Sequence, residues 1–575
     1  MVYLFSVALG PAQEFIAAAR RTRDLWFSSH LLSELSKAAA GKIGKDNLIF
    51  PAVANENDLK PESDFNVVNK ILAKVEGDPQ ELGEKIKAAV CRRLTEIKDE
   101  AFSRLPDGSY DADKSAAQID DLPEIYWAAV PLVEGKYKEA RAEVEALLAA
   151  RKNTRDFKST ERWSGNEPKS SLDGLRESVI RDAAALEKLG VKKAETLCGV
   201  GLLKRVGKRD VRFSSTSHIA ALPLILSLKD EQQVRQAIQD YKKTLDDLHI
   251  SEQAFDPLKN SPSQVFPYDG HILFEEQLKE FFDDSQQDEL RKAKVALRRL
   301  LKEIADGQSP SPYYAILHGD GDRMGEVIDA QGEDNHKKLS AALSQFAQQV
   351  KTIVEERHHG SLVYAGGDDV LALVPLHTVV QCARALADTF KDRLREFKAE
   401  SGQSPTLSVG IGISHQMEPL EDALNLAREA EKEAKKLDGK NALCLKVSKR
   451  SGAVTTVKGG WDEDVDERLL AFVGFHEREE LPDGAAYELR RLADEFNDFA
   501  PEHKADAYRK EAARILSRKQ SKRGAEKVKE AIQKELLDRL PADPEKIADA
   551  VRSLADELIV ARLFVNKFSQ KGVAK

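Results

Sequence analysis

The chain is organised around the stretch LVYAGGDDVLALV, residues 362–374. Apolar, β-favouring residues flank Gly-Gly-Asp-Asp on both sides, which predicts a hairpin whose tip carries Asp368 and Asp369. Gly366 and Gly367 allow backbone conformations closed to other residues and let a bulky anion approach the main chain. Two adjacent aspartates also occur in ordinary hairpin turns, so the motif alone leaves a structural and a functional interpretation open.

A second stretch of glycines and carboxylates lies upstream, in YYAILHGDGDRMG, residues 313–325. It predicts a strand that ends in polar residues and is followed by a helix. After the hairpin, helical spacing over 379–394 leads to a predicted strand at 407–413. The order β-α-β-β-α-β is the ferredoxin-like arrangement. Because the first strand then ends at the same sheet edge as the hairpin tip, we expect Asp320 to lie beside Asp368 and Asp369.

Three carboxylates at one sheet edge are typical of a two-metal site. Mg²⁺ takes oxygen ligands and is usually held by one or two carboxylates together with substrate phosphates. Two such ions can activate an attacking hydroxyl and stabilise a leaving pyrophosphate. We therefore predict Mg²⁺ or Mn²⁺ on Asp320 and Asp369, with Asp368 assisting and the Gly321 carbonyl as a backbone ligand. The nucleotide-binding candidates near this edge are Gly321, Asp322, Gly366, Gly367, Lys435 and Lys440.

The lysines come from a predicted helix over 420–437 and the turn that follows it. Lys435, Lys436 or Lys440 could neutralise a triphosphate. Solvated lysines at the end of a helix also complement the helix dipole, and this second interpretation stays open.

The motifs around both glycine-carboxylate stretches and the amino terminus resemble those of a known protein family. Residues 313–443 resemble the palm domain shared by GGDEF nucleotide cyclases and family-B-like polymerases. The pair Asp-Gly-Asp-Arg-Met-Gly and Gly-Gly-Asp-Asp resembles the large polymerase/cyclase subunit of type III CRISPR effector complexes. The amino-terminal stretches LFSVALGPAQEFI, residues 4–16, and ARRTRDLW, residues 19–26, are similar to the Cmr branch, type III-B.

The resemblance implies an activity and a set of partners. It implies conversion of ATP to 3′–5′ linked cyclic oligoadenylate and pyrophosphate, triggered by target RNA, in a complex with guide RNA and other Cmr-type subunits. Adenine specificity comes from the resemblance alone. The alternatives are another nucleotide product from the same site, or a scaffold that grips a guide-RNA complex. Relatives often begin with an HD nuclease domain; no adjacent His-Asp pair occurs here, so this domain is not expected.

Composition bounds the class of protein. The 575 residues suggest about four domains, and 88 basic against 97 acidic residues give a net charge of −9, which does not by itself indicate nucleic acid. Apolar runs are too short to span a membrane, and no signal peptide is expected. Four scattered cysteines favour a reducing cytoplasm and predict neither disulfides nor a zinc site.

We predict an α+β chain with two ferredoxin-like palm domains plus helical domains. The predicted domains are a first palm without metal ligands and with a helical insertion (1–190), a helical linking domain (191–304), a second palm with the GGDD motif (305–455) and a C-terminal helical domain (461–575). In the first palm, Gly10 to Gln13 takes the place of Gly319 to Asp322. Gly10 and Gln13 are candidates for contact with an acceptor nucleotide, or simply form a strand-to-helix turn.

Three basic segments are candidates for RNA or subunit contact, with solvated surface as the alternative. They are residues 150–175, residues 204–217, which include Lys204 and Arg205, and residues 514–529.

Overall fold

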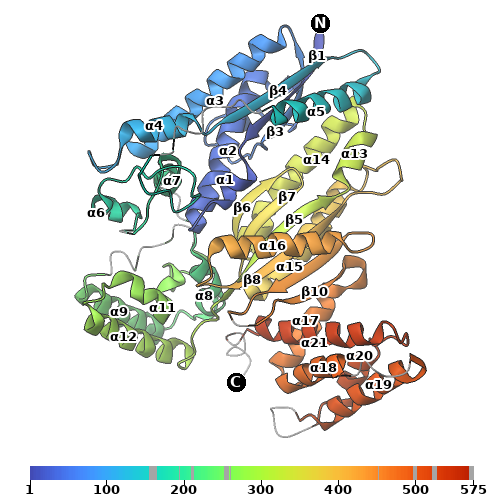
Figure 1. The fold of residues 1–575 in the computed structure, drawn as a ribbon. Coiled ribbons are helices and arrows are strands. Elements are labelled where there is room, and N and C mark those ends of the chain that lie inside the picture. Colours follow the sequence, from blue (N-terminus) through green and yellow to red (C-terminus); the bar gives the residue numbers. More distant parts are fainter. Residues whose placement is uncertain are drawn as a thin grey trace.

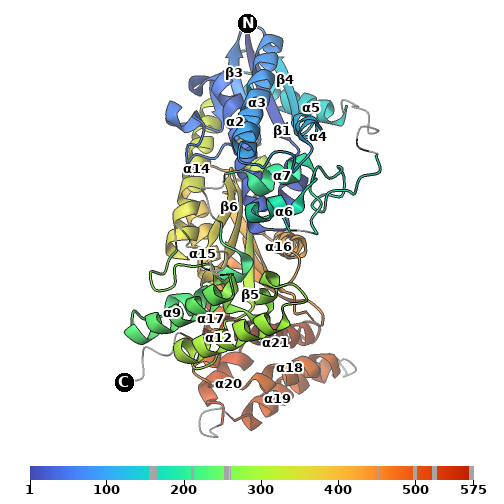
Figure 2. The same ribbon diagram turned by 90° about the vertical axis from the view of Figure 1, so that its left-hand side faces the viewer.

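The computed structural model describes residues 1–154, 163, 165–192, 194–208, 213–250, 255, 258, 261–450, 452–495, 501–520, 527–566 and 568. The chain has two β-sheets, each covered by helices, and helical regions beside and below the second sheet (Figures 1 and 2). This arrangement confirms the α+β class.

The first sheet has the strand order β2-β3-β1-β4. Its strands are β1 (Val2–Gly10), β2 (Leu48–Phe50), β3 (Lys70–Glu76) and β4 (Glu124–Pro131), and β1 runs antiparallel to both β3 and β4. Helices α2 (Thr22–Ile43) and α3 (Pro79–Phe102) follow β1 and β3. The insertion predicted as helical between β2 and β4 does contain α3, but it also contains the strand β3, which the prediction missed and which is an integral part of the sheet.

The second sheet has the strand order β10-β9-β8-β5-β7-β6. Its strands are β5 (Tyr313–Asp322), β6 (Ser361–Gly366), β7 (Asp369–Val374), β8 (Thr406–His415), β9 (Ala442–Val447) and β10 (Thr455–Gly460). The four strands β8-β5-β7-β6 have the predicted ferredoxin-like order, and β4-β1-β3-β2 of the first sheet repeats it.

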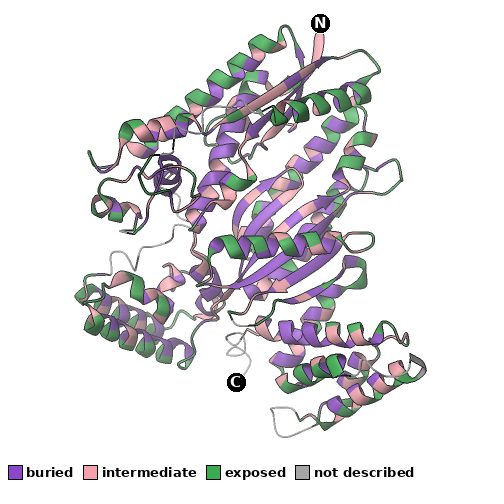
Figure 3. Ribbon diagram, viewed as in Figure 1, coloured by how far each residue is buried: buried purple, intermediate pink, exposed green. Residues whose placement is uncertain are grey.

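Each face of the second sheet is buried under different helices (Figure 3). Because side chains alternate along a strand, Ala315 and Leu317 of β5 join the core beneath α14 (Glu333–Lys351) and α15 (Leu376–Leu394). Tyr314 and Ile316 join the opposite core, which includes α8 (Thr216–Ser227) and α16 (Leu420–Lys435). Helices thus pack against both faces of the sheet, and this packing holds in place the strand ends that carry the carboxylates.

The remaining helices complete the two halves. The first half contains α1 (Gln13–Ala17), α4 (Ala112–Asp120), α5 (Tyr137–Asn153), α6 (Ala183–Leu186) and α7 (Gly199–Val206). Beyond it come α9 (Gln232–Asp247), α11 (Glu275–Leu278), α12 (Gln287–Ala305) and α13 (Met324–Ala330). The C-terminal helices are α17 (Val465–Glu477), α18 (Asp483–Glu495), α19 (Pro501–Arg518), α20 (Glu530–Leu537) and α21 (Ile547–Phe564).

Helix α7 is part of the core of the first half. Its apolar residues join the same cluster as β1, α2 and α3, so the predicted boundary at residue 190 falls inside one packing unit. Arg205 is 1% exposed and makes two hydrogen bonds each to Asp24 and Glu195. Lys204 donates to the Phe15 and Ala18 carbonyls. The prediction that these two basic residues contact RNA was wrong, because both are buried structural groups.

Parts of the other predicted basic segments lie outside the described residues. These parts are residues 155–162 and 164, residues 209–212 and residues 521–526. Within the described part of the chain, none of the helices combines the length and the apolar character needed to cross a bilayer.

The two sheet-bearing halves contact one another along α14. Ser340 Oγ accepts from the Ala52 amide at 2.7 Å, and Ser344 Oγ donates to the Ala52 carbonyl at 3.0 Å. The Tyr137 hydroxyl and His336 Nδ1 lie 2.8 Å apart, and Arg141 pairs with Asp329. These contacts along α14 are polar, and apolar residues of the first half, among them Phe50 and Leu25, also pack against the cores of the second half.

Candidate active site

The register of β5 and β7 brings the predicted carboxylates together. The last residue pair between these strands is Gly319 with Val370, so Asp320 and Asp369 come next on each strand. Asp368 lies over Gly321: a β-carbon at Gly321 would be 2.7 Å from the Asp368 β-carbon. Asp320, Asp368 and Asp369 are therefore neighbours although 48 residues separate the first two in sequence.

The hairpin tip also lies against the first half of the molecule. Gly367 has φ +64°, in the left-handed region that favours glycine. A β-carbon at Gly366 would be 2.9 Å from Val68, and one at Gly367 would be 3.6 Å from Phe50. The two glycines thus permit both the tight turn and the close approach of the other domain.

Helix α16 supplies a carboxylate that the sequence did not predict. Glu431 is 7% exposed, and its Oε1 lies 3.3 Å from Lys435 Nζ, one helical turn away. Helix α16 comes this close because Gly410 and Gly412 of β8 have no side chains. A β-carbon at Gly410 would lie 2.6 Å from the Ala427 carbonyl oxygen, and one at Gly412 would lie 2.7 Å from the Ala427 amide nitrogen. The sequence does contain one sign that Glu431 is unusual: this charged residue interrupts the apolar face of the helix formed by Ala427, Ala430 and Ala434.

Lys435 lies at the carboxylates, whereas Asp322 is engaged elsewhere. The Lys435 ammonium pairs with Asp320 and also lies 3.5 Å from the Gly321 carbonyl. Asp322 is fully buried, and its carboxylate accepts hydrogen bonds from Thr406, Ser408 and the Asn441 amide. Lys440 precedes Asn441 in a turn with φ +57°; its amide donates to the Leu437 carbonyl, and its ammonium makes no hydrogen bond or ion pair with the described residues.

The carboxylates repel one another in the absence of a cation. Burial raises the pKa of Asp368 to about 6. Burial and the charges of Asp368 and Glu431 also raise the pKa of Asp369. Removing water from several neighbouring carboxylates disfavours their ionised forms unless a cation joins them.

The donor set fits a hard divalent cation. Three aspartates and the Gly321 carbonyl offer only oxygen atoms, as Mg²⁺ and Mn²⁺ prefer. The Lys435 ammonium already contacts Asp320, Gly321 and Glu431, which shows that this group of oxygens attracts a positive charge. Asp320, Asp368, Asp369 and Gly321 could hold such an ion.

A cavity of about 380 Å³ opens beside the carboxylates, between the two halves of the molecule. Asp320, Asp369 and Glu431 line it together with residues of the first half, namely Gln13, Ser29, Ser33 and Asn69. Arg428 and Lys432 of α16 also line it, and among the described residues no hydrogen bond or ion pair engages the Arg428 guanidinium. Gln13 therefore faces the same cavity as the carboxylates, whereas Gly10 is not among its lining residues.

His318, two residues before Asp320 on β5, also lines this cavity. Its Nδ1 has no hydrogen-bond partner among the described residues, and burial lowers the pKa of the ring to about 4. Sequence reasoning did not select it, because a single histidine in a strand is usually a core residue.

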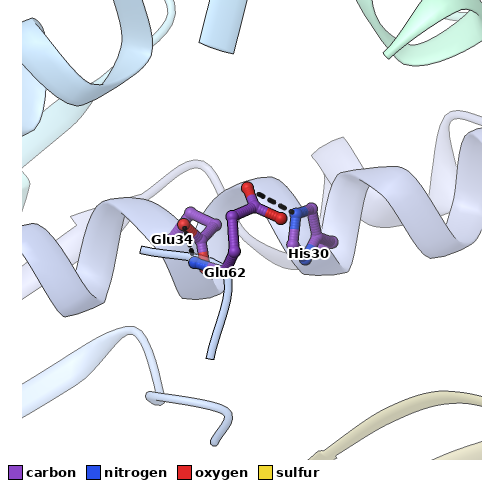
Figure 4. A group of neighbouring side chains, drawn as sticks. All are labelled: His30, Glu34 and Glu62. Atoms are coloured by element: carbon purple, nitrogen blue, oxygen red, sulfur yellow. Dashed lines mark hydrogen bonds and ion pairs between the residues drawn. The ribbon is translucent and has the colours of Figure 1, made fainter. Parts of the chain in front are cut away.

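A second cluster, His30, Glu34 and Glu62, has side chains of the kind that bind metals (Figure 4). Cations of the protein already occupy it. Arg93 lies 2.6 Å from Glu34 and 3.0 Å from Glu62, Lys37 lies 2.8 Å from Glu34, and Lys208 pairs with Glu62. This cluster is a charge network that holds α2 to the loop before β3.

Comparison with known proteins places the two halves in one family. Residues 4–157 match the family model described as CRISPR-associated protein Cmr2, N-terminal. Residues 313–444 match the model described as Cas10/Cmr2, second palm domain. The second match spans the carboxylates, the hairpin and α16.

Similar proteins agree with this assignment. The CRISPR system Cmr subunit Cmr2 of Pyrococcus furiosus is 26% identical over 80% of this chain, which spans 63% of that protein's length. A type III-B Cmr-beta structure in the apo state superposes with a TM-score of 0.61 at 13% identity, over 92% of this chain and 78% of the other. A Cmr-beta structure bound to cognate target RNA superposes with a TM-score of 0.55, also at 13% identity, over 92% of this chain and 79% of the other. Since both its amino-terminal and its carboxylate-bearing regions match models of this family, the chain belongs to the Cas10/Cmr2 family.

Proposed function

We propose that this protein is a nucleotidyltransferase that converts ATP to cyclic oligoadenylate within a target-RNA-activated, antiviral type III-B CRISPR effector complex. The observation that carries the proposal is the convergence of Asp320, Asp368 and Asp369 beside a cavity enclosed by both halves of the molecule. Such a site can hold one nucleotide on the carboxylates and a second against the first half.

The roles of the residues follow from their positions. Asp320, Asp368, Asp369 and the Gly321 carbonyl would hold Mg²⁺ or Mn²⁺, which when bound would activate a 3′-hydroxyl and neutralise the leaving pyrophosphate. Gly366 and Gly367 keep the hairpin tip free of side chains. Lys435, with Lys440 as the alternative, offsets triphosphate charge as the hydroxyl attacks the α-phosphorus.

The charges around the cavity support a polyphosphate ligand. Arg428, Lys432 and Lys435 follow one another at spacings of four and three residues along α16, so they lie on one side of the helix. The first half contributes neutral groups, Gln13, Ser33 and Asn69, which suit the hydrogen bonding of a base or sugar. The same topology of the two sheets supports a pair of palm domains of which one carries the ligands.

The partners we propose are other Cmr-type subunits, guide RNA and target RNA in the cytoplasm. Family membership supports them, as does the resemblance to a Cmr-beta assembly described as bound to cognate target RNA.

The test uses protein purified from its host with its partners and RNA retained. ATP, Mg²⁺ and an RNA complementary to the bound guide are added, and the products are resolved by mass spectrometry. We expect cyclic oligoadenylates, and we expect Asp368→Ala with Asp369→Ala to abolish them while the complex still assembles. The matched control is Glu421→Ala with Asp422→Ala, which removes two adjacent exposed carboxylates of the same domain and should leave the products unchanged.

Two outcomes would contradict the proposal. If the intact, guide-loaded complex makes no product from ATP, the site uses another nucleotide or the protein is a scaffold. If product survives the double alanine change, the chemistry occurs at another site.

A further inference from the structure

A second, larger cavity of about 740 Å³ lies where the first half, the linking helices and the second sheet meet. The segment after α1 contributes Arg20 and Arg21, and the start of α8 contributes Thr216 and Ser217. Gln416, directly after β8, forms another part of the wall. None of these residues has a place in the proposed reaction.

This cavity is separate from the carboxylate site. Asp320 of β5 pairs with Ser408 of β8, whereas Gln416 lies eight residues farther along the same strand direction. At about 3.4 Å per residue, the two places are roughly 27 Å apart. The two cavities share no lining residue.

The carboxylates in the cavity wall already have partners. Glu195 is bound by Arg205, and Lys192 lies 3.0 Å from Glu280. Asp269 accepts hydrogen bonds from Ser215 and His271. The Ser448 hydroxyl donates to Glu418 at 3.2 Å.

The two arginines, in contrast, are not neutralised. No described residue makes a side-chain hydrogen bond or an ion pair with the guanidinium of Arg20 or Arg21. Burial and the charge of Arg205 lower the pKa of Arg21, and the opposing charges of Glu195, Asp24 and Glu280, none of which pairs directly with its guanidinium, do not restore it. Gln416 is 6% exposed and its Nε2 donor also lacks a described partner, since its Oε1 accepts from Ser217 and Gln277. A partly buried arginine without a counter-ion is unfavourable unless an anion joins it.

We propose that this cavity binds a phosphate-bearing ligand through Arg20 and Arg21. Guanidinium groups match phosphate oxygens in geometry and charge. A cavity of this volume can enclose a molecule of nucleotide size. The phosphate can come from a free nucleotide or from an RNA strand, and this binding is independent of the proposed nucleotidyl transfer.

The test measures binding by isothermal titration calorimetry on the full chain carrying Asp368→Ala and Asp369→Ala, so that the carboxylate site contributes no metal-dependent binding. The probes are ATP, inorganic pyrophosphate and a 5′-phosphorylated single-stranded RNA. Arg21→Gln and Arg20→Gln are compared with Arg291→Gln, an exposed arginine of α12 that pairs with Asp288. Since a charge-assisted hydrogen bond contributes more than a neutral one, we expect Arg21→Gln to weaken binding by at least about tenfold. Arg291→Gln should not change it.

The probes also separate the sources of the phosphate. Binding of ATP or pyrophosphate that depends on Arg21 supports a free nucleotide, and binding of the RNA alone supports a strand. If no probe binds, or if all bind equally well to Arg21→Gln, the proposal is overturned. Thermal unfolding gives an independent check: Arg21→Gln should keep or raise the melting temperature, because it removes an unpaired charge. A clear decrease would show that Arg21 has a structural partner and would also overturn the proposal.

Discussion

Replacing Gly410 with alanine should separate α16 from the sheet and impair the carboxylate site without altering any of its side chains. The new β-carbon would lie 2.0 Å from the Glu431 amide nitrogen and 2.6 Å from the Ala427 carbonyl oxygen. Ordinary contact begins at 3.4 Å, so the gap to the nearest atom has to open by 1.4 Å, the difference between 3.4 and 2.0 Å. Both obstacles are backbone atoms, which cannot move aside by changing rotamer.

The size of the effect follows from this geometry. Overfilling a packed site costs about 1–3 kcal/mol. For a domain of this size, that lowers the melting temperature by roughly 2–12 °C. The retreat also moves Glu431 and Lys435 away from Asp320 and Gly321, and a misplacement of about 1 Å can cost roughly a hundredfold in rate. Activity should therefore decline more than stability.

The matched control is Gly319→Ala on the adjacent strand. A β-carbon at Gly319 would lie 3.5 Å from Leu407, which is ordinary contact. Its melting temperature should stay the same or rise slightly, since alanine reduces the entropy of the unfolded chain. Differential scanning calorimetry and nucleotide turnover would be measured on both variants. If Gly410→Ala melts and turns over like the parent protein, the argument that β8 glycines position α16 is refuted.

Two further predictions concern burial and pH. Arg205→Ala leaves Asp24 and Glu195 without their cation and should lower the free energy of unfolding of the first half by about 3–5 kcal/mol, measured by denaturant unfolding. Arg235→Ala, which breaks the exposed pair with Asp230, should leave the denaturant midpoint unchanged. Equal midpoints for the two variants would contradict the buried network. The pKa of Asp368 is raised from 3.8 to about 6, so ionisation opposes folding of the metal-free protein increasingly as pH rises through this range. The pKa of Asp369 is raised to about 7, so Mn²⁺ affinity, measured by titration, should be full only above about pH 7 and fall below it by at least about tenfold per pH unit. A flat profile would show that these carboxylates are not ligands.

The sequence predicted strands β5 to β8 of the second sheet because they carry both an apolar strand pattern and glycine turns, whereas β9 and β10 were not predicted. In residues 362–374, two apolar runs flank one glycine-containing turn, which predicts the hairpin. The ferredoxin-like order of the strands then places Asp320 beside the tip of this hairpin. Strand β3 was missed because Lys70, Lys74 and Glu76 interrupt its apolar residues. A short strand with charged positions is hard to distinguish from a helix start without its partners.

The errors at charged residues have a common physical cause. Lys204 and Arg205 look like a basic surface, yet Arg205 is neutralised by Asp24, which is 181 residues away. Glu431 looks like an ordinary helical glutamate, yet two glycines in the preceding strand β8 let α16 pack close enough to bring it into the site. Charge patterns along a chain do not reveal which charges are paired, because the partners meet only in the folded protein.

The polar contacts along α14 have a consequence for any molecule that occupies the cavity between the two halves. Serine hydroxyls and ion pairs, unlike an interlocked apolar core, can be broken and reformed with water as a substitute partner. A molecule that touches both walls adds its own contacts to this interface. By thermodynamic reciprocity, it strengthens the association of the halves by the same factor by which that association strengthens its binding. A substitution such as Ser340→Ala, which removes the hydrogen bond from the Ala52 amide, is thus linked to occupancy of the cavity through the contact between the halves.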